Sequence, residues 1–219
     1  TTDVDGTGSV VATGSGTITG NIGNTTKITA VTINTGNTLT VSGNVKATTT
    51  TLVGAGSTLA LTAAGHTVDS AIVSTPGAAG AITIADGNTT TAFLGNVGTA
   101  AKTLASLAVA GNGGNTVTTT GNLYVDAITM GGATDTLQLL GTSAQTFSGT
   151  YQTGVLTVGN GAATSDVTFS GILGAGTPLA SINVTTGAKA TFNNDVTTAG
   201  TFTAANGTTT TIAAGKTLA

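Results

Sequence analysis

Apolar residues alternate with Thr and other small polar residues in short runs along this chain. The alternation is explicit at Leu39/Val41, Leu59/Leu61, Ile82/Ile84, Leu156/Val158, Val167/Phe169 and Ile182/Val184. A period of two places one set of side chains on one face of a pleated strand and the other set on the opposite face. Thr suits the outer face because its β-branched side chain fits a half-buried pleated surface. The pattern predicts many short strands, each with one wet face.

Gly-Asn pairs interrupt these runs. They begin at Gly20, Gly23, Gly36, Gly43, Gly87, Gly95, Gly111, Gly114, Gly121 and Gly159. Both residues tolerate a positive φ, and the Asn amide bonds nearby backbone groups, so each pair can turn a corner without a steric penalty. We expect the ten corners to share one repeated geometry.

Longer phrases recur as well, in residues 28–45 (ITAVTINTGNTLTVSGNV), 107–125, 156–173 and 182–196. A repeated unit that cannot bury its own apolar face must stack on its neighbours. Matched strand starts lie near Val31, Leu52, Ile82, Leu107, Leu137, Leu156, Ile182 and Phe202, about 19 to 30 residues apart. Thr and Gly disfavour helical repeats. We predict an all-β fold, a β-solenoid (parallel β-helix) of roughly nine irregular coils.

The alternative fold is a β-sandwich, which also suits short strands with frequent turns. Facing sheets are usually filled by large side chains, including aromatics, whereas the inward candidates here are mostly Val, Ile, Leu and Ala. Those sizes favour a narrow solenoid lumen. Residues 100–110 (AAKTLASLAVA) are the helix-like stretch of the chain, either a short insertion or another strand. No linker divides the sequence, so we expect one domain over residues 1–219.

Composition narrows the class of protein through what is missing. The chain has no Glu, Arg, Cys or Trp, and 8 acidic against 5 basic residues give a net charge of −3. Such a weak field argues against nucleic acid as a partner. Without cysteine there is no disulfide framework and no thiolate metal site. No apolar run approaches the roughly 18 residues of a spanning helix, so we expect no transmembrane segment.

His66 lies close to Asp69 and Ser70, which raises the question of a catalytic triad. A triad is defined by geometry, and the chain contains no Gly-x-Ser-x-Gly elbow. A turn His bonded to the backbone is the favoured interpretation.

Glycoside hydrolysis would need two carboxyl groups roughly 5 to 9 Å apart. Asp3 and Asp5 would share a strand face, whereas the other acids are scattered: Asp69, Asp86, Asp126, Asp135, Asp166 and Asp195. No Arg is present to clamp an anionic sugar, and aromatic residues are few. We expect no catalytic residue and no enzyme.

Two loops contain residues of the kind that bind calcium. Residues 3–8 (DVDGTG) form an oxygen-rich run, and residues 131–139 (GGATDTLQL) approach a glycine-and-aspartate repeat. Calcium loops of this kind act in repetition, and each occurs once here. Solvated turns are the favoured interpretation, and no metal or other cofactor is expected.

Thr-rich runs suggest a further hypothesis. They fall at 38–40, 48–51, 118–120, 201–203 and 208–211. A flat Thr array is what ice-binding solenoids display, but the spacing of these runs is too uneven to predict one.

Several phrases resemble a known class of proteins: NTLTVSGNV, NTVTTTGNLYV, DVTFSGIL and ATFNNDVTTAGTFT. They are similar to passenger regions of bacterial autotransporter adhesins, including rickettsia-type outer-membrane surface antigens, and to surface-layer proteins. The resemblance implies an exported, non-catalytic protein at the bacterial cell surface. It rests on composition and cadence, so it transfers no functional residue.

Two functions follow from this reading. A structural coat or filament subunit would self-associate, because a solenoid ends in open strand edges that template further pairing. Residues 208–219 (TTTTIAAGKTLA) look like a coil broken in mid-phrase. An adhesin would instead bind a host receptor or matrix, through inserted loops expected near residues 53–82 and 107–137. The structural subunit is the leading hypothesis.

Overall fold

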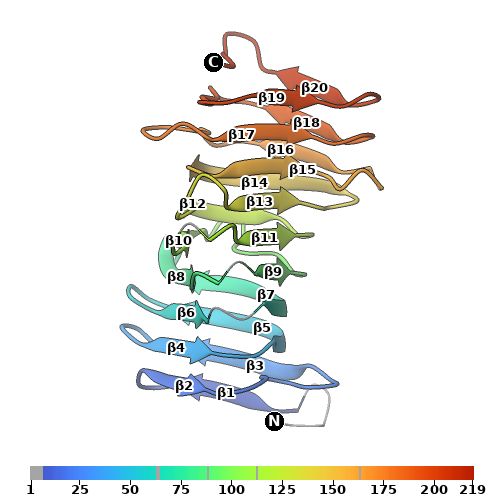
Figure 1. Cartoon of the computed structure of the whole chain (residues 1–219). Coiled ribbons are helices and arrows are strands. Elements are labelled where there is room, and N and C mark those ends of the chain that lie inside the picture. Colours follow the sequence, from blue (N-terminus) through green and yellow to red (C-terminus); the bar gives the residue numbers. More distant parts are fainter. Residues whose placement is uncertain (1–6, 63–64, 88, 112, 163) are drawn as a thin grey trace.

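The chain folds into a stack of parallel β coils with no helix in its described part (Figure 1). The computed structural model describes residues 7–62, 65–87, 89–111, 113–162 and 164–219. All the strand pairings found there are parallel. The predicted β-solenoid is confirmed, and the alternative of a β-sandwich is wrong.

The strands form two ten-stranded sheets, with odd-numbered strands in one and even-numbered strands in the other. The first sheet contains β1 (Ser9–Ala12), β3 (Ile28–Ile33), β5 (Val45–Val53), β7 (His66–Thr75), β9 (Thr90–Phe93), β11 (Thr116–Thr119), β13 (Thr136–Leu139), β15 (Val155–Val158), β17 (Ser181–Val184) and β19 (Phe202–Ala204). The second contains β2 (Gly16–Ile18), β4 (Thr38–Val41), β6 (Thr58–Leu61), β8 (Ala79–Ile84), β10 (Leu104–Val109), β12 (Leu123–Thr129), β14 (Ala144–Gln152), β16 (Asp166–Phe169), β18 (Lys189–Phe192) and β20 (Thr209–Ile212).

The register joins residues of successive coils into three continuous lines. Line A runs through Gly16, Leu39, Leu59, Ile82, Leu107, Ile128, Tyr151, Leu173, Val196 and Leu218. Line B runs through Ile22, Val45, Val68, Phe93, Thr119, Leu139, Val158, Val184 and Ala204. Line C runs through Val10, Val31, Thr50, Ile72, Val97, Leu123, Phe147, Phe169, Phe192 and Ile212. The chain visits them in the order C, A, B, so each coil has three sides.

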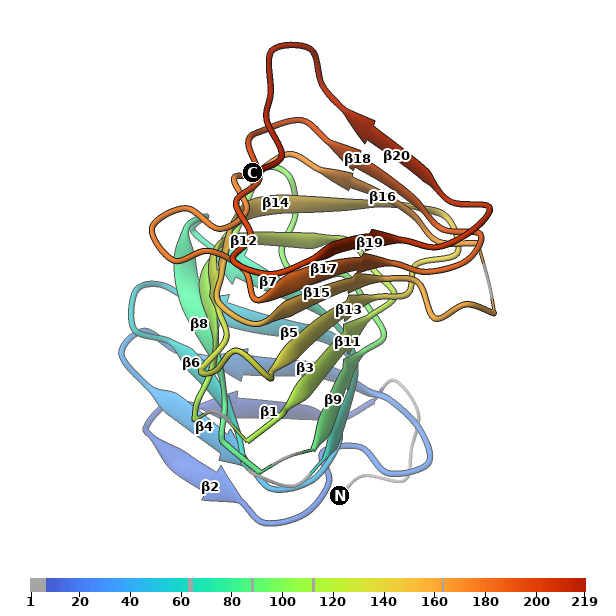
Figure 2. The same ribbon diagram turned by 45° about the horizontal axis from the view of Figure 1, so that its top comes forward.

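Along the stack, each sheet passes from one side of the coils to another, because some of its strands bend around a corner (Figure 2). β7 carries Val68 of line B and Ile72 of line C within one strand. β14 carries Phe147 of line C and Tyr151 of line A. The tight corner therefore lies between lines B and C in the early coils, and between lines C and A in the late ones.

The core fills the inside of the coils. Inward residues of β4, β6, β13 and β15 are buried while their neighbours are half-buried, as the period of two predicts. The predicted aliphatic filling is confirmed in the early coils but is wrong for the late part of line C. There the Phe147 ring is tilted against Phe169, and Phe169 stacks on Phe192, with ring centroids 5.4 and 4.9 Å apart. Phe93 of line B and Tyr151 of line A are buried too, so the solenoid lumen accommodates aromatic rings on all three lines.

The observed spacing of the coils also corrects the predicted intervals of about 19 to 30 residues between matched strands. Leu52 pairs with Ile33 and Ser74, beside line C, whereas Ile82 belongs to line A, so the expected 30-residue interval joined two different sides. Register steps run from 19 residues, as between Thr136 and Val155, to 26, as between Thr90 and Thr116. The helix-like stretch at 100–110 contains β10, so it is another strand.

Candidate functional site

Asparagine side chains lock one coil to the next at the corners. The Oδ1 atom of Asn21 accepts the backbone N–H of Asn44 at 2.8 Å, and that of Asn44 accepts the N–H of Thr67 at 2.8 Å. Asn122 stands in a second such file, donating its N–H to Asn96 and accepting that of Thr146. These files precede line B in the early coils and line C in the middle ones. Each converts an orphan corner N–H into a bonded one.

Asp195 fills the same role before line A. Its Oδ1 accepts the N–H of Thr217 at 3.0 Å and the hydroxyl of Thr217 at 3.1 Å. Hydrogen bonds to a carboxylate favour its charged form. The backbone N–H of Thr217, followed by its hydroxyl, accordingly lowers the pKa of Asp195.

Glycine is required at several corners because the backbone of the preceding coil lies close to it. A Cβ atom at Gly43 would lie 2.5 Å from the carbonyl carbon of Gly20, and one at Gly121 would lie 2.6 Å from that of Gly95. Neither glycine has a positive φ, whereas Gly36 has a φ of 73° in a turn. The Gly-Asn pairs therefore serve two purposes, and the prediction of one repeated geometry is wrong. Asn88 and Asn112 lie outside the described residues.

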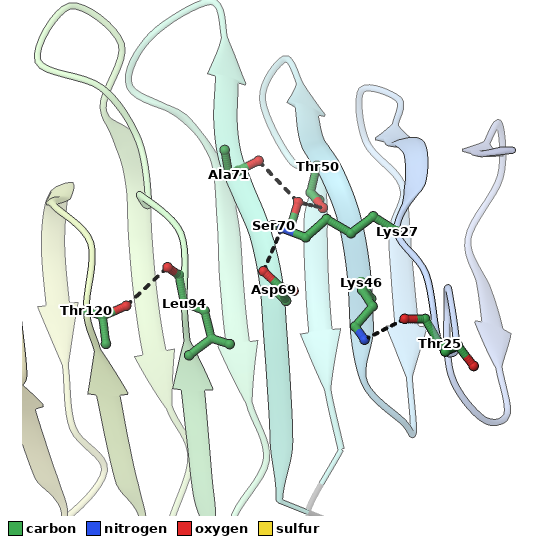
Figure 3. A network of polar contacts seen from close by, with 9 residues as sticks. All are labelled: Thr25, Lys27, Lys46, Thr50, Asp69, Ser70, Ala71, Leu94 and Thr120. Atoms are coloured by element: carbon green, nitrogen blue, oxygen red, sulfur yellow. Dashed lines mark hydrogen bonds and ion pairs between the residues drawn. The ribbon is translucent and has the colours of Figure 1, made fainter. Parts of the chain in front are cut away.

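A cluster of charged side chains joins three early coils. Lys27 Nζ lies 2.6 Å from Asp69, and Lys46 Nζ donates to the Thr25 carbonyl at 3.1 Å (Figure 3). A pocket of about 220 Å³ opens beside them, lined by Asn21, Gly23, Asn24, Asn44, Val45, Lys46, Thr67 and Asp69. The charged groups are partly exposed and already paired, so this cluster ties neighbouring coils together. An exposed pair of this kind contributes about 1 kcal/mol or less to stability.

His66 takes no part in a triad. Its Nδ1 lies 2.8 Å from the Gly43 carbonyl oxygen, and its Nε2 lies 3.0 Å from the Thr62 carbonyl oxygen. Alternation along β7 turns the Asp69 side chain outward, toward Lys27, while His66 and Ser70 are buried. The predicted bonding of His66 to the backbone is confirmed, but its predicted place in a turn is wrong, because His66 is the first residue of β7.

The Asp135 turn is not solvated, so that prediction is wrong. Asp135 is fully buried, and its carboxylate accepts the N–H groups of Asn115 and Gly132. The Asn115 amide bridges to Asp86 one coil away at 3.0 Å. Within the described residues, no three His, Asp, Glu or Cys side chains gather as a metal site. Asp3 and Asp5, with most of the 3–8 loop, lie outside those residues.

Threonines do align into files. Thr146, Thr168, Thr191 and Thr211 stack in register on β14, β16, β18 and β20. This file is not visible in the sequence, because the coils differ in length. The extra residues lie in the corners, so the strands still align. The sequence left a Thr array as a minor hypothesis, and on this side of the late coils four threonines do lie in one file.

The segments expected as inserted loops are mostly strands. Residues 53–82 contain β6 and β7, and residues 107–137 contain β11 and β12. Residues 63, 64 and 112 in these segments lie outside the described residues. No helix in the described part of the chain is long and apolar enough to span a membrane.

The two end coils expose residues of the core lines. At one end, Ile212 of line C is 36% exposed and Leu218 of line A is half-buried. Phe202, two residues before Ala204 of line B, is half-buried as well. At the other end, a pocket of about 110 Å³ is lined by Ser9, Val10, Ile18, Asn21, Ile22, Gly23 and Ile28. Within the described residues, β1, β2, β19 and β20 are the outer strands of their sheets. These two ends are the candidate functional surfaces.

The chain matches no protein-family model, no curated protein and no solved structure. The fold and the chemistry of the end coils are therefore the basis for a functional proposal.

Proposed function

We propose that this chain is a non-catalytic structural subunit of a bacterial surface coat or filament, which assembles by stacking its end coils on those of further copies. The observation that carries the proposal is the exposure of Ile212 and the partial exposure of Leu218, at the ends of lines C and A whose inner members are buried. Removing such apolar side chains from water is favourable. The outer strands also present unpaired backbone groups that can accept another strand.

Charge does not oppose this contact. Residues 7–24 of the first coil carry no charged side chain, and residues 201–219 carry Lys216 alone. Lys216 Nζ lies 3.9 Å from Asp195. Two ends of this kind approach without electrostatic repulsion. The extracellular location is supported by the resemblance of the repeated phrases to autotransporter passengers.

Light scattering and negative-stain electron microscopy over a range of protein concentrations test the proposal. We expect concentration-dependent linear assemblies one solenoid wide. Ile212→Lys places a charge on the end coil and should reduce assembly at least tenfold. Ile172→Lys is the matched control. Ile172 is 44% exposed but belongs to an inner coil, so a charge there does not lie on either end surface. Single rods at every concentration would contradict the proposal.

The aligned threonines favour a second candidate, binding to ice. Neighbouring strands place the hydroxyl groups of Thr146, Thr168, Thr191 and Thr211 about 4.8 Å apart in a straight file. A thermal-hysteresis measurement on the wild-type chain and on Thr168→Lys tests this function. Absence of hysteresis in the wild type removes it. An adhesin role would rest on the side faces, since the expected loops are mostly strands.

A further inference from the structure

We infer that the pocket beside Lys46 binds a tetrahedral oxyanion, a phosphate or sulfate group. The pocket lies on the side of the stack, where Asn21, Asn44 and Thr67 of three successive coils line it together with Lys46 and Asp69. This surface is separate from the two end coils, so the site does not depend on end-to-end assembly.

The first asparagine file supplies amide donors at the pocket wall. The Oδ1 atoms of Asn21 and Asn44 accept the backbone N–H groups of Asn44 and Thr67, both at 2.8 Å. A backbone N–H donates to the oxygen of an amide and not to its nitrogen, so these bonds also identify the Nδ2 atoms. Within the described residues, neither Nδ2 atom has a hydrogen-bond partner. Because successive coils are about 4.8 Å apart, the two NH2 groups form a short row of donors.

Lys46 adds a positive charge to these donors. Its register partner on the next coil is Asp69, yet within the described residues the polar partner of its Nζ atom is the Thr25 carbonyl oxygen, at 3.1 Å (Figure 3). Asp69 is bound by Lys27 instead, at 2.6 Å. A carbonyl oxygen occupies one of the three ammonium donors and leaves the charge in place. The pocket wall therefore combines a neutralised aspartate with a lysine that has no counter-charge.

This set of groups suits an anion better than a cation or a neutral sugar. Amide NH2 groups and an ammonium group donate hydrogen bonds and accept none. Hydrogen bonds in which one partner is ionised are about twice as strong as those between neutral groups. A cation would be repelled by Lys46, and a neutral sugar would gain little from its charge. Phosphate and sulfate present several acceptor oxygens on one small centre, so they can accept from more than one coil at once.

The second asparagine file shows that the corner does not need the lysine. There the Asn122 side chain makes the same bond to the next coil, accepting the N–H of Thr146 at 2.7 Å. Tyr124 lies two residues after Asn122, as Lys46 lies two residues after Asn44. The corner is thus built with either residue, and the positive charge of Lys46 is available for a ligand.

Equilibrium dialysis with radiolabelled inorganic phosphate, at constant ionic strength in sodium chloride, tests the site whether or not the chains assemble. We expect saturable binding to the wild type. Asn44→Asp replaces the NH2 group with a carboxylate oxygen and should weaken binding by about tenfold or more. The corner bond to Thr67 should survive, because Asp195 accepts the N–H of Thr217 in the same way, at 3.0 Å.

Asn122→Asp is the matched control, since it makes the same change in the file that has Tyr124 in place of Lys46. It should leave phosphate binding unchanged. Equal losses in Asn44→Asp and Asn122→Asp would overturn the assignment of the site. Melting temperatures measured by circular dichroism show that both variants remain folded.

Asp69→Asn separates an oxyanion from a neutral ligand. This exchange removes the one carboxylate of the pocket wall and frees Lys27, so phosphate should bind several-fold more tightly. The fold should tolerate it, because an exposed ion pair contributes about 1 kcal/mol or less. Weaker binding in a folded Asp69→Asn chain would overturn the proposal, since it would mean that the carboxylate itself holds the ligand.

Competition with glycerol phosphate identifies the source of the group. Displacement of phosphate by glycerol phosphate assigns the pocket to a phosphate carried on a larger molecule, whereas displacement by inorganic phosphate and sulfate alone assigns it to the free ion. Wild-type binding no stronger than that of Asn44→Asp refutes the site and leaves the proposed assembly standing. Phosphate binding by chains that remain single rods refutes the assembly alone.

Discussion

Replacing Gly171 with alanine should open the corner between two late coils. A Cβ atom at this position would overlap the Gly149 carbonyl oxygen of the preceding coil. Real Cβ atoms essentially never come within 3.0 Å of such an atom, and a backbone oxygen cannot rotate away as the end of a flexible side chain can. The two coils must therefore separate locally.

Three backbone hydrogen bonds hold this corner, and they set the magnitude. Ser170 N–H donates to Phe147 at 2.8 Å, Tyr151 N–H to Ile172 at 3.2 Å, and Gly174 N–H to Tyr151 at 2.8 Å. At about 1 kcal/mol net for each bond, loss of two or three costs about 2–3 kcal/mol. For a chain of this size we expect the melting temperature to fall by roughly 4–12 °C.

Thermal unfolding followed by circular dichroism measures this effect, with Gly14→Ala as the matched control. A Cβ atom at Gly14 would have no other atom within 4 Å, and Gly14 has no positive φ. Its replacement should be neutral, or stabilising by up to about 1 kcal/mol through the unfolded chain. Equal melting temperatures for Gly171→Ala and Gly14→Ala would refute the close-approach argument.

Two further predictions concern the aromatic part of the core. Phe169→Ala removes a fully buried ring from between Phe147 and Phe192 and should cost about 3–5 kcal/mol in denaturant unfolding. An effect no larger than that of the outward Thr168→Ala would contradict it. Burial raises the pKa of Tyr151, whose hydroxyl donates to the Val155 carbonyl. Above about pH 10 the unfolded chain loses this proton while the folded chain keeps it, so stability should fall by about 1.4 kcal/mol per pH unit. Tyr151→Phe should show a shallower alkaline slope, and identical slopes would count against the burial argument.

The sequence predicts the fold class well because its information is local. Alternation at Leu39/Val41 and Leu156/Val158 marks strands, and both pairs do face inward on β4 and β15. Stacking follows because such strands cannot bury a face alone. The prediction that His66 bonds to the backbone was also local, because it followed from the absence of a Gly-x-Ser-x-Gly motif in the chain.

The features that the sequence did not predict depend on contacts between residues of neighbouring coils. Leu52 and Ile82 look equivalent in sequence, yet they lie on different sides, since corner lengths vary. Asp135 looks like a turn residue, but its donor Asn115 comes from the coil before. Gly171 carries no local sign that Gly149 lies against it. The functional surfaces, likewise, consist of line residues that become exposed only where the stack ends.

The migration of the tight corner has a consequence for fidelity. In an array of identical repeats, a chain can slip by one whole coil and still pair every strand, which invites misfolded isomers. Here the side between lines C and A has ten residues at Ile72 and four at Phe192, so an early coil cannot take the place of a late one without a mismatch in outline. The change of shape therefore keeps the early and late parts of the stack from exchanging, although their residues are of very few types.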